Sequence, residues 1–251
     1  MQTQVDPKQH VAEGTSFHSF VGWTLLLTLG PIFILITILG TYGIALIAWI
    51  VAGIRYASRV RRATARLRGS AVRVDQSQFS EIHRSVQEMS QQLGLPECPD
   101  VYVMEDNQQN AFALKYGSKR CVILIDDVVH GALATGNNKV LDFIVAHELA
   151  HHALGHTNFL RSIISARYHP LSRLDELSCD AVANALVSDP KAARDALTLL
   201  LVGPQLFQRV DKMVLDHQAR EVAADPYSMK SEAGLSHPLL LRRYARLQST
   251  T

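Results

Sequence analysis

The longest uncharged stretch of the chain lies near its N-terminus, where no Asp, Glu, Lys or Arg occurs from Val21 to Ile54. One helix of that length, rising about 1.5 Å per residue, would exceed the roughly 30 Å hydrocarbon core of a bilayer. The turn-prone segment Gly40 to Gly43 divides the stretch into two antiparallel spans, whereas Gly30 and Pro31 would kink one tilted helix. We expect residues 17–54 to form a transmembrane helical hairpin or one kinked helix, and we favour the hairpin.

Arginines follow the uncharged stretch directly, beginning with Arg55, and no acidic residue occurs between Arg55 and Asp75. The positive-inside rule places such a flank in the cytoplasm, and the same basic surface suits anionic lipid headgroups. A cleaved signal peptide would need a shorter apolar region and a basic start, and this N-terminus offers only Lys8. We therefore expect a polar tail over residues 1–16 and a basic connector over 55–76, with a catalytic domain that faces the cytoplasm.

Residues 77–251 alternate short strand-like runs with longer amphipathic segments. Apolar positions three and four apart predict helices, and short runs of β-prone residues between Asn, Asp, Gly and Ser predict strands. The predicted helices cover 77–93, 139–154, 171–187 and 191–201, and the predicted strands cover 101–104, 111–116 and 121–125. The polar segment 211–236 lacks periodicity, and we interpret it as a mobile loop or a surface connection. The pattern predicts an α+β domain, mostly helical with a small antiparallel sheet.

Charge and cysteine content narrow the class of protein. A formal net charge of +2 gives no reason to expect a nucleic-acid partner. The three cysteines, Cys98, Cys121 and Cys179, are an odd number without C-x-x-C spacing, which argues against a disulfide framework. This cysteine usage agrees with a reducing cytoplasm.

The predicted helix 139–154 contains the sequence His147-Glu148-Leu149-Ala150-His151, an H-E-x-x-H motif. Histidines four residues apart share one helix face and can both bind a zinc ion, with Glu148 reaching the metal-bound water as a general base. The alternative, a solvated patch of histidines, fits poorly with flanking residues that are apolar. Two imidazoles and a carboxylate would be costly to bury there without a metal.

A catalytic zinc site usually takes a third protein ligand and leaves one position for water. Glu176 and Asp180 lie four residues apart on the predicted helix 171–187, so both can face the first helix. We expect Glu176 to bind the single zinc ion of the chain and Asp180 to hydrogen-bond the free nitrogen of a ligand histidine. The competing third ligands are His152, which points off the ligand face, His156, whose spacing does not match a known extension of the motif, and Asp175, which needs another helix phase.

H-E-x-x-H followed by E-x-x-x-D after a short spacer resembles the membrane zinc peptidases related to the heat-shock protease HtpX and to the CAAX prenyl proteases, which are gluzincins. Weaker matches are Asn110 to Ala113, the Arg173 ahead of Glu176, and Ser236-His237-Pro238 ahead of a basic helix. The resemblance implies that Asn110, Ala111, Phe112 and Ala113 form the edge strand of a cleft, to which an extended substrate adds as another strand. It also implies that His237 lies near the metal and helps to hold the oxyanion. The chain departs from the larger relatives because no membrane-spanning run separates its two metal motifs.

These expectations describe a zinc-dependent endopeptidase that is attached to the lipid bilayer and acts on unfolded or membrane-associated polypeptides. Glu148 would take the proton of the attacking water and pass it to the leaving amine. The rival hypotheses are an inactive membrane-anchored zinc scaffold that binds a client protein, and a hydrolase of non-peptide amides. A structural zinc site is normally closed by four ligands, so the three ligands and the base expected here favour the enzyme over the scaffold.

Overall fold

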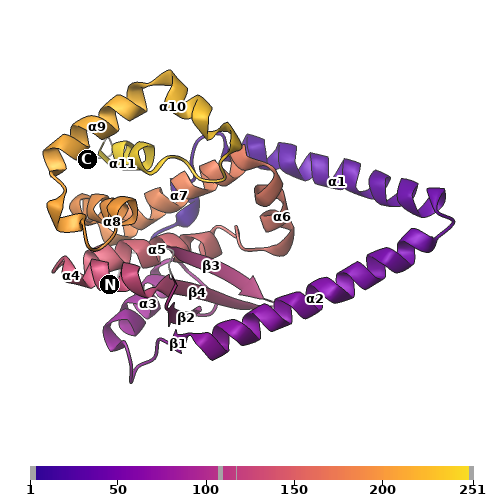
Figure 1. Ribbon diagram of the computed structural model, residues 1–251, viewed down its shortest axis with the longest axis horizontal. Helices are drawn as coiled ribbons and strands as arrows, with labels where there is room; N and C mark the ends of the chain where they lie inside the picture. The colour runs from indigo at the N-terminus through magenta and orange to yellow at the C-terminus, as the bar shows by residue number, and fades with distance from the viewer. Residues whose placement is uncertain (1–3, 107–109, 117, 249–251) are drawn as a thin grey trace.

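A helical body packs on one face of a four-stranded sheet, and two long helices extend from the molecule as a V (Figure 1). The computed structural model describes residues 4–106, 110–116 and 118–248. The N-terminal part contains η1 (Pro7–His10), α1 (Thr15–Gly40) and α2 (Ile44–Ser70). The strands are β1 (Val72–Arg73), β2 (Asp100–Met104), β3 (Ala111–Tyr116) and β4 (Lys119–Ile125). The remaining elements are α3 (Ser80–Gln92), α4 (Asp126–Ala134), α5 (Lys139–Ala153), α6 (Phe159–Arg167), α7 (His169–Val187), α8 (Pro190–Val202), η2 (Phe207–Arg209), α9 (Lys212–Ala224), α10 (Pro226–Ser231), η3 (Glu232–Gly234) and α11 (Leu240–Gln248).

The sheet is mixed, so the expectation of an antiparallel sheet was wrong. Its strand order is β1-β2-β4-β3, in which β2 and β4 run parallel and the other two pairs run antiparallel. After β2 the chain passes beyond the central position to form the edge strand β3. It then turns back as β4 between β3 and β2, which aligns β4 with β2. The strand-forming runs were predictable, but their order depends on a connection that local periodicity does not encode.

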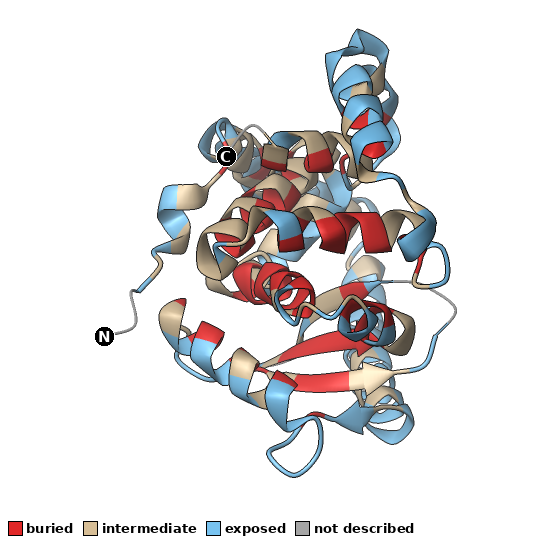
Figure 2. Ribbon diagram, turned by 90° about the vertical axis from the view of Figure 1, so that its left-hand side faces the viewer, coloured by how far each residue is buried: buried red, intermediate tan, exposed pale blue. Residues whose placement is uncertain are grey.

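Alternate residues of β4 enter two different apolar clusters, as the period of a strand requires. Val122 and Leu124 face the main core, which α3, α5, α7 and α8 complete. Cys121, Ile123 and Ile125 face the opposite side, where the end of α2 covers them through Leu67 and Ala71. Figure 2 shows the buried residues concentrated in the strands and the central helices. Helices therefore cover both faces of the sheet, and the helix on the outer face is α2, one arm of the V.

Helix α5 lies at the centre of the body and is apolar on nearly every side. Its first turn is held by Asn137, whose Oδ1 accepts a hydrogen bond of 3.1 Å from the Lys139 backbone N–H. Eleven of its residues are buried, including His147 and Glu148. A helix buried all round belongs to the core of a protein, so the candidate ligands sit on a rigid element.

The segment 211–236, which we interpreted as a mobile loop or surface connection, forms α9, α10 and η3. Asp211 begins α9 by accepting the backbone N–H groups of Met213 and Val214, and Asp225 begins α10 by accepting that of Tyr227. Only Leu215 and Ala219 of α9 are buried. Because two buried positions make a weak periodic signal, the N-capping aspartates were the better evidence for helices here.

The two arms of the V both begin on the body. Near its start, α1 packs on α6 and α7, where the His18 Nδ1 atom lies 2.6 Å from the Tyr168 hydroxyl oxygen. Helix α2 continues through most of the expected basic connector before it reaches the sheet at β1. Of the described helices, α1 is long and apolar enough to cross a membrane. The expected break at Gly40 to Gly43 is present as the turn that joins the arms.

Gly22 lets α1 approach α6 closely, since a Cβ atom at this position would overlap the Ile164 side chain. We predict that Gly22→Leu lowers the free energy of unfolding by about 1–3 kcal/mol, the usual cost of overpacking. Gly30→Leu is the matched control, because no atom lies within contact distance of a Cβ there. Thermal unfolding of both variants in detergent micelles measures the difference. Equal stability of the two variants would contradict the docking of α1 on α6.

Candidate metal centre

Two packed helices bring the predicted ligands together. Helix α5 presents His147 and His151 one turn apart, and α7 presents Glu176 opposite them. The Nε2 atom of His147 lies 3.4 Å from one carboxylate oxygen of Glu176, and the Nε2 atom of His151 lies 3.4 Å from the other. The same nitrogen of both imidazoles therefore points toward one carboxylate.

The opposite nitrogens of the two imidazoles are held by other residues. The His147 Nδ1 atom lies 2.9 Å from Oδ1 of Asp180, as expected for an outer hydrogen bond that fixes the ring. The His151 Nδ1 atom lies 3.2 Å from Nδ1 of His156. These contacts on the Nδ1 side orient both rings so that their Nε2 atoms point toward Glu176.

Arg243 of α11 completes the centre, and sequence reasoning missed it. Its guanidinium donates to both oxygens of Asp180 at 2.8 and 2.7 Å and to Glu176 at 3.2 Å. Only 6% of the surface of Arg243 is exposed, so its ion pairs with the two carboxylates are buried. An arginine at a buried position of an amphipathic helix was the available signal, but the basic character of α11 concealed it.

The buried charges shift one another's pKa values strongly. Burial lowers the pKa of His147, but the Asp180 and Glu176 carboxylates have the larger, opposite effect and raise the pKa to about 10. Burial raises the pKa of Asp180, yet Arg243 and His147 outweigh burial and bring it to about 2. Burial likewise opposes ionisation of Glu176, but its hydrogen bonds with His147 and His151 hold its pKa well below the usual value. The carboxylates around His147 thus favour a cation at this position.

Glu148 lies beside the ligand face, on the wall of a cleft of about 570 Å³. The cleft is lined by Asn110 to Ala113, by the three predicted ligands, and by His237 and Arg243. Burial raises the pKa of Glu148 above its ordinary value, despite the opposing effect of His147 and His151. A carboxylate with a raised pKa in a cleft is suited to proton transfer near neutral pH.

His237 reaches the centre from the segment between η3 and α11. Its Nε2 atom lies 3.5 Å from a Glu176 oxygen, and its side chain remains 62% exposed. Arg173 of α7 donates to the carbonyl oxygens of Glu232 and Leu235 at 2.8 and 2.9 Å, which fixes the segment that leads to His237. The arginine that we noted ahead of Glu176 therefore positions the residues around His237.

Strand β3 borders the same cleft and forms an edge of the sheet in the described part of the chain. The Asn110 carbonyl accepts a hydrogen bond from the Ile125 N–H, so the backbone groups of Asn110 face β4. Backbone direction alternates along an antiparallel pair, which turns the N–H and C=O groups of Ala111 and Ala113 toward the free edge. The expected edge strand is therefore present next to the candidate ligands.

The competing third ligands have other partners. His152 lies 3.1 Å from the Cys121 carbonyl and 3.0 Å from the Thr157 hydroxyl, so both of its nitrogens are engaged away from the centre. Asp175 pairs with Arg161 and accepts a hydrogen bond from Ser165. His156 lies behind His151, with its Nε2 atom 3.3 Å from Asp175.

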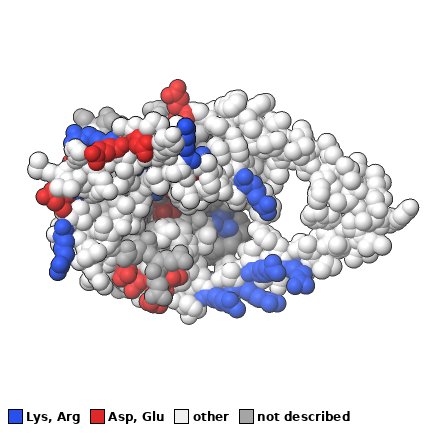
Figure 3. Space-filling model, turned by 45° about the horizontal axis from the view of Figure 1, so that its top comes forward, with Lys and Arg blue, Asp and Glu red and all other residues white. Residues whose placement is uncertain are grey.

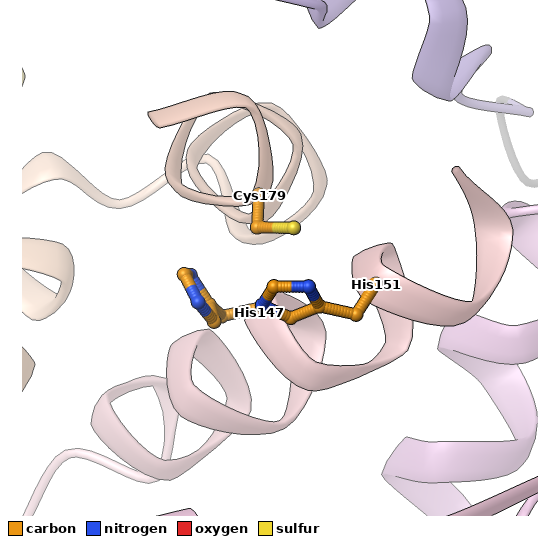
Figure 4. A group of neighbouring side chains, drawn as sticks. All are labelled: His147, His151 and Cys179. Carbon is orange, nitrogen blue, oxygen red and sulfur yellow. The ribbon is translucent and has the colours of Figure 1, made fainter. Parts of the chain in front are cut away.

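Cys179 is closer to the histidines than its sequence position suggested. The metal-ligating atoms of His147, His151 and Cys179 all lie within 4.8 Å of one another, and Figure 4 shows the thiol directed from α7 toward the two rings of α5. Burial and the carboxylates around Cys179, foremost Glu176 and Glu148, raise the pKa of this thiol well above its ordinary value. Because the thiolate is the form that binds zinc, the ionised Glu176 is the better third ligand.

The donor set fits zinc. Two imidazole Nε2 atoms and one carboxylate on facing helices form the three-ligand arrangement of catalytic zinc sites, and the adjoining cleft gives access to a further position. The hydrogen bonds behind His147 are of the kind that raise imidazole basicity. We therefore describe this cluster as a candidate zinc centre.

Comparison with known proteins agrees with this description. Residues 76–169 match the model of Peptidase family M48. The plastoglobule-localized metallopeptidase 48 of Arabidopsis thaliana, a chloroplastic protein, is 26% identical over 203 residues, which cover 70% of this chain and 58% of that relative. Protease HtpX homologs of Thermoanaerobacter pseudethanolicus and Caldanaerobacter subterraneus subsp. tengcongensis are 32% and 37% identical over 81 residues, which cover 32% of this chain and 26% of each relative. No solved structure matches the chain significantly.

These matches confirm the resemblance to HtpX-related zinc metallopeptidases and support a metallopeptidase. The family match includes the H-E-x-x-H helix and ends before Glu176. The aligned regions also span less than two thirds of each of these relatives. Glu176, Asp180 and Arg243 are therefore assigned from geometry.

Arg243 offers a direct test of the buried charge network. We predict that Arg243→Met lowers the free energy of unfolding by about 3–5 kcal/mol, because it leaves buried carboxylates without their cation. Arg243→Lys should recover part of the loss, since lysine keeps the charge but not the paired donors. The exposed Arg220 is the control, and Arg220→Met should change stability by less than about 0.5 kcal/mol. Urea unfolding provides the measurement, and equal effects at both positions would refute the network.

Proposed function

We propose that this protein is a membrane-attached zinc endopeptidase that cleaves unfolded or membrane-associated polypeptides. The observation that carries the proposal is the convergence of the His147 and His151 Nε2 atoms on the two oxygens of Glu176, 3.4 Å away in each case. Glu148 lines the same cleft, so a general base accompanies the ligand set. Bound zinc would acidify an attacking water and polarise the scissile carbonyl.

Substrate binding in this proposal begins at the edge of the sheet. The Ala111 carbonyl and the backbone groups of Ala113 hydrogen-bond an extended chain, which adds antiparallel or parallel to β3, while the Ala111 N–H already donates to Oδ1 of Asn110 at 2.9 Å. The pairing places the backbone of the substrate along the wall that faces α5, where Glu148 lies. Recognition through backbone groups requires an extended segment, which favours unfolded polypeptides over folded ones.

The proton transfers are assigned to Glu148. Its carboxylate accepts a proton from the attacking water and returns it to the leaving amine, so the group ends in its starting state. His237 is assigned to the developing oxyanion, because its Nε2 atom lies at the cleft beside Glu176 while its Nδ1 atom lies 2.8 Å from the Ser236 hydroxyl oxygen, which holds the ring in place. Asp180 and Arg243 keep His147 aligned and do not touch the substrate.

Membrane attachment is the second part of the proposal. The uncharged run and the arginines that follow it support attachment with the body on the cytoplasmic side. The principal alternative function is a zinc-containing scaffold that binds clients without cleaving them. The retention of Glu148 at the cleft favours catalysis, since a scaffold has no use for a buried base.

Zinc content distinguishes the candidate third ligands. We predict about one zinc per chain, and loss of most of it in His147→Ala, His151→Ala and Glu176→Ala, because a catalytic site has three protein ligands. Cys179→Ala should keep its zinc and is the matched control on the same helix. Metal analysis of the purified variants gives the answer. Retention in Glu176→Ala together with loss in Cys179→Ala would assign the third position to the thiol instead.

Glu148→Gln separates chemistry from metal binding, because the amide keeps the shape of the side chain but cannot accept a proton. We predict that zinc content stays at the parent value while casein hydrolysis falls by about 10²- to 10⁴-fold, the usual contribution of general acid–base catalysis. Glu221→Gln, at an exposed position of α9, should cleave casein at the parent rate. A fully active Glu148→Gln would rule out this mechanism. An inactive parent that still binds unfolded casein would favour the scaffold.

A further inference from the structure

The two arms of the V are joined to the same body at both ends. Helix α1 leaves it where Gly22 contacts Ile164, and α2 returns to it where Leu67 packs on the outer face of the sheet. The turn between the arms is the part of the V farthest from the body (Figure 1). If the turn inserts into a membrane, both arms therefore insert to a similar depth.

The charged residues of α2 limit how deeply the V can enter a membrane. Helix α1 carries no Asp, Glu, Lys or Arg, but α2 is uncharged only from Ile44 to Ile54. At about 1.5 Å per residue this segment is roughly 16 Å long, about half of the roughly 30 Å hydrocarbon core. If the turn crossed to the far side of a bilayer, Arg55 and Arg59 would lie within the hydrocarbon, where each arginine is costly.

The backbone donors of the turn are hydrogen-bonded within the turn itself. The N–H groups of Tyr42, Gly43, Ile44 and Leu46 donate to the carbonyls of Leu39, Ile38, Thr41 and Gly43, at 2.9–3.3 Å. The Thr41 hydroxyl accepts the Ala45 N–H at 3.0 Å and donates to the Thr37 carbonyl at 2.7 Å. Five consecutive donors are therefore satisfied within the turn. A turn in water could leave these groups to solvent, whereas a turn in hydrocarbon cannot.

The side chains that flank the turn are mostly apolar and outward-facing, and Tyr42 at the apex is exposed as well. Leu39, Ile44 and Ile47 are 66–71% exposed. The arms are joined near the turn by an edge-to-face contact of Phe33 with Trp49, whose ring centroids are 6.2 Å apart. Figure 3 shows that the V is free of charge toward its apex, and that basic side chains gather lower on the arm formed by α2. The surface thus changes from apolar to cationic along one arm.

We propose that the V inserts into a single leaflet of an anionic bilayer, with its apex near the midplane and Arg55 and the following arginines at the headgroups. The inference deepens the membrane attachment proposed above and rests on it. It replaces the two-span hairpin and the single kinked span that the sequence suggested. The insertion holds the body, and the cleft with it, against one membrane surface. The arginines select anionic headgroups, each contributing to binding near the surface.

Single reactive cysteines in the full chain test the insertion depth. In a Cys98→Ser background, where Cys121 and Cys179 are buried, one cysteine is introduced by Tyr42→Cys at the apex or by Ser70→Cys at the body end of α2. The proteins are reconstituted into sealed vesicles of phosphatidylcholine and phosphatidylglycerol and treated with a membrane-impermeant maleimide. Tyr42 packs on little, since it is 98% exposed, so its substitution should not disturb folding.

We expect Ser70→Cys to react in the outward-facing fraction of molecules and Tyr42→Cys to stay unlabelled until detergent is added. A nitroxide at the apex should be relaxed by oxygen and not by a polar nickel chelate. In molecules whose body faces the vesicle interior, position 70 is protected from the maleimide. Labelling of Tyr42→Cys in that fraction would mean that the turn reaches the opposite side of the bilayer, and it would overturn the proposal in favour of a spanning hairpin. Labelling of both positions in the same fraction would place the apex outside the lipid.

Two further outcomes overturn the proposal on other grounds. Cross-linking of Tyr42→Cys between chains, with poor access of oxygen to the nitroxide, would mean that a second copy covers the apex. Failure of the parent chain to sediment with these vesicles would remove the proposed membrane attachment itself. Zinc content and casein cleavage are measured on the same samples, so failure of the insertion is distinguishable from failure of the peptidase assignment.

Discussion

The carboxylate of Asp180 connects three helices that are distant in sequence. It belongs to α7, contacts His147 of α5, and receives two hydrogen bonds from Arg243 of α11. Only 2% of the residue is exposed, and a carboxylate buried to that extent is stable only when it is paired. The orientation of His147 therefore depends on α11 being in place, which makes the end of the chain part of the candidate zinc centre.

The depressed pKa of Asp180 gives this arrangement its electrostatic character. With a pKa of about 2 the side chain remains ionised over the physiological range, as does Glu176. Together with Asp180 and Glu176, the nearby Glu148 offers a third carboxyl group, while Arg243 supplies one permanent positive charge. His147 adds a second positive charge because its pKa is raised to about 10, and a bound divalent cation would take the place of that proton, so binding of the metal and stability of the fold are coupled through the same few groups.

Local spacing was enough to predict much of this centre. The two histidines of α5 and the Glu176–Asp180 pair of α7 are each four residues apart, so a helix alone aligns them. Arg243 lies 63 residues beyond Asp180, and its contact depends on how α11 packs, which spacing does not reveal. The expectation of an antiparallel sheet was wrong for the same reason, because β4 enters the sheet parallel to β2, a strand that is not its neighbour in sequence. In α9 the periodic signal was weak, but the capping residue Asp211 was readable.

The boundary that the sequence suggested before residue 77 does not separate two independent parts of the molecule. Strand β1 pairs with β2 along the edge of the sheet, and Leu67 and Ala71 cover its outer face. Proteolytic cleavage at this boundary would remove β1 together with Leu67 and Ala71. It would leave the edge of β2 unpaired and the apolar outer face of the sheet uncovered. Such edges recruit other chains, so a released fragment would tend to aggregate rather than act as a free protease in solution. In the membrane-attached peptidase proposed above, the same contacts would tie the integrity of the body to its membrane attachment.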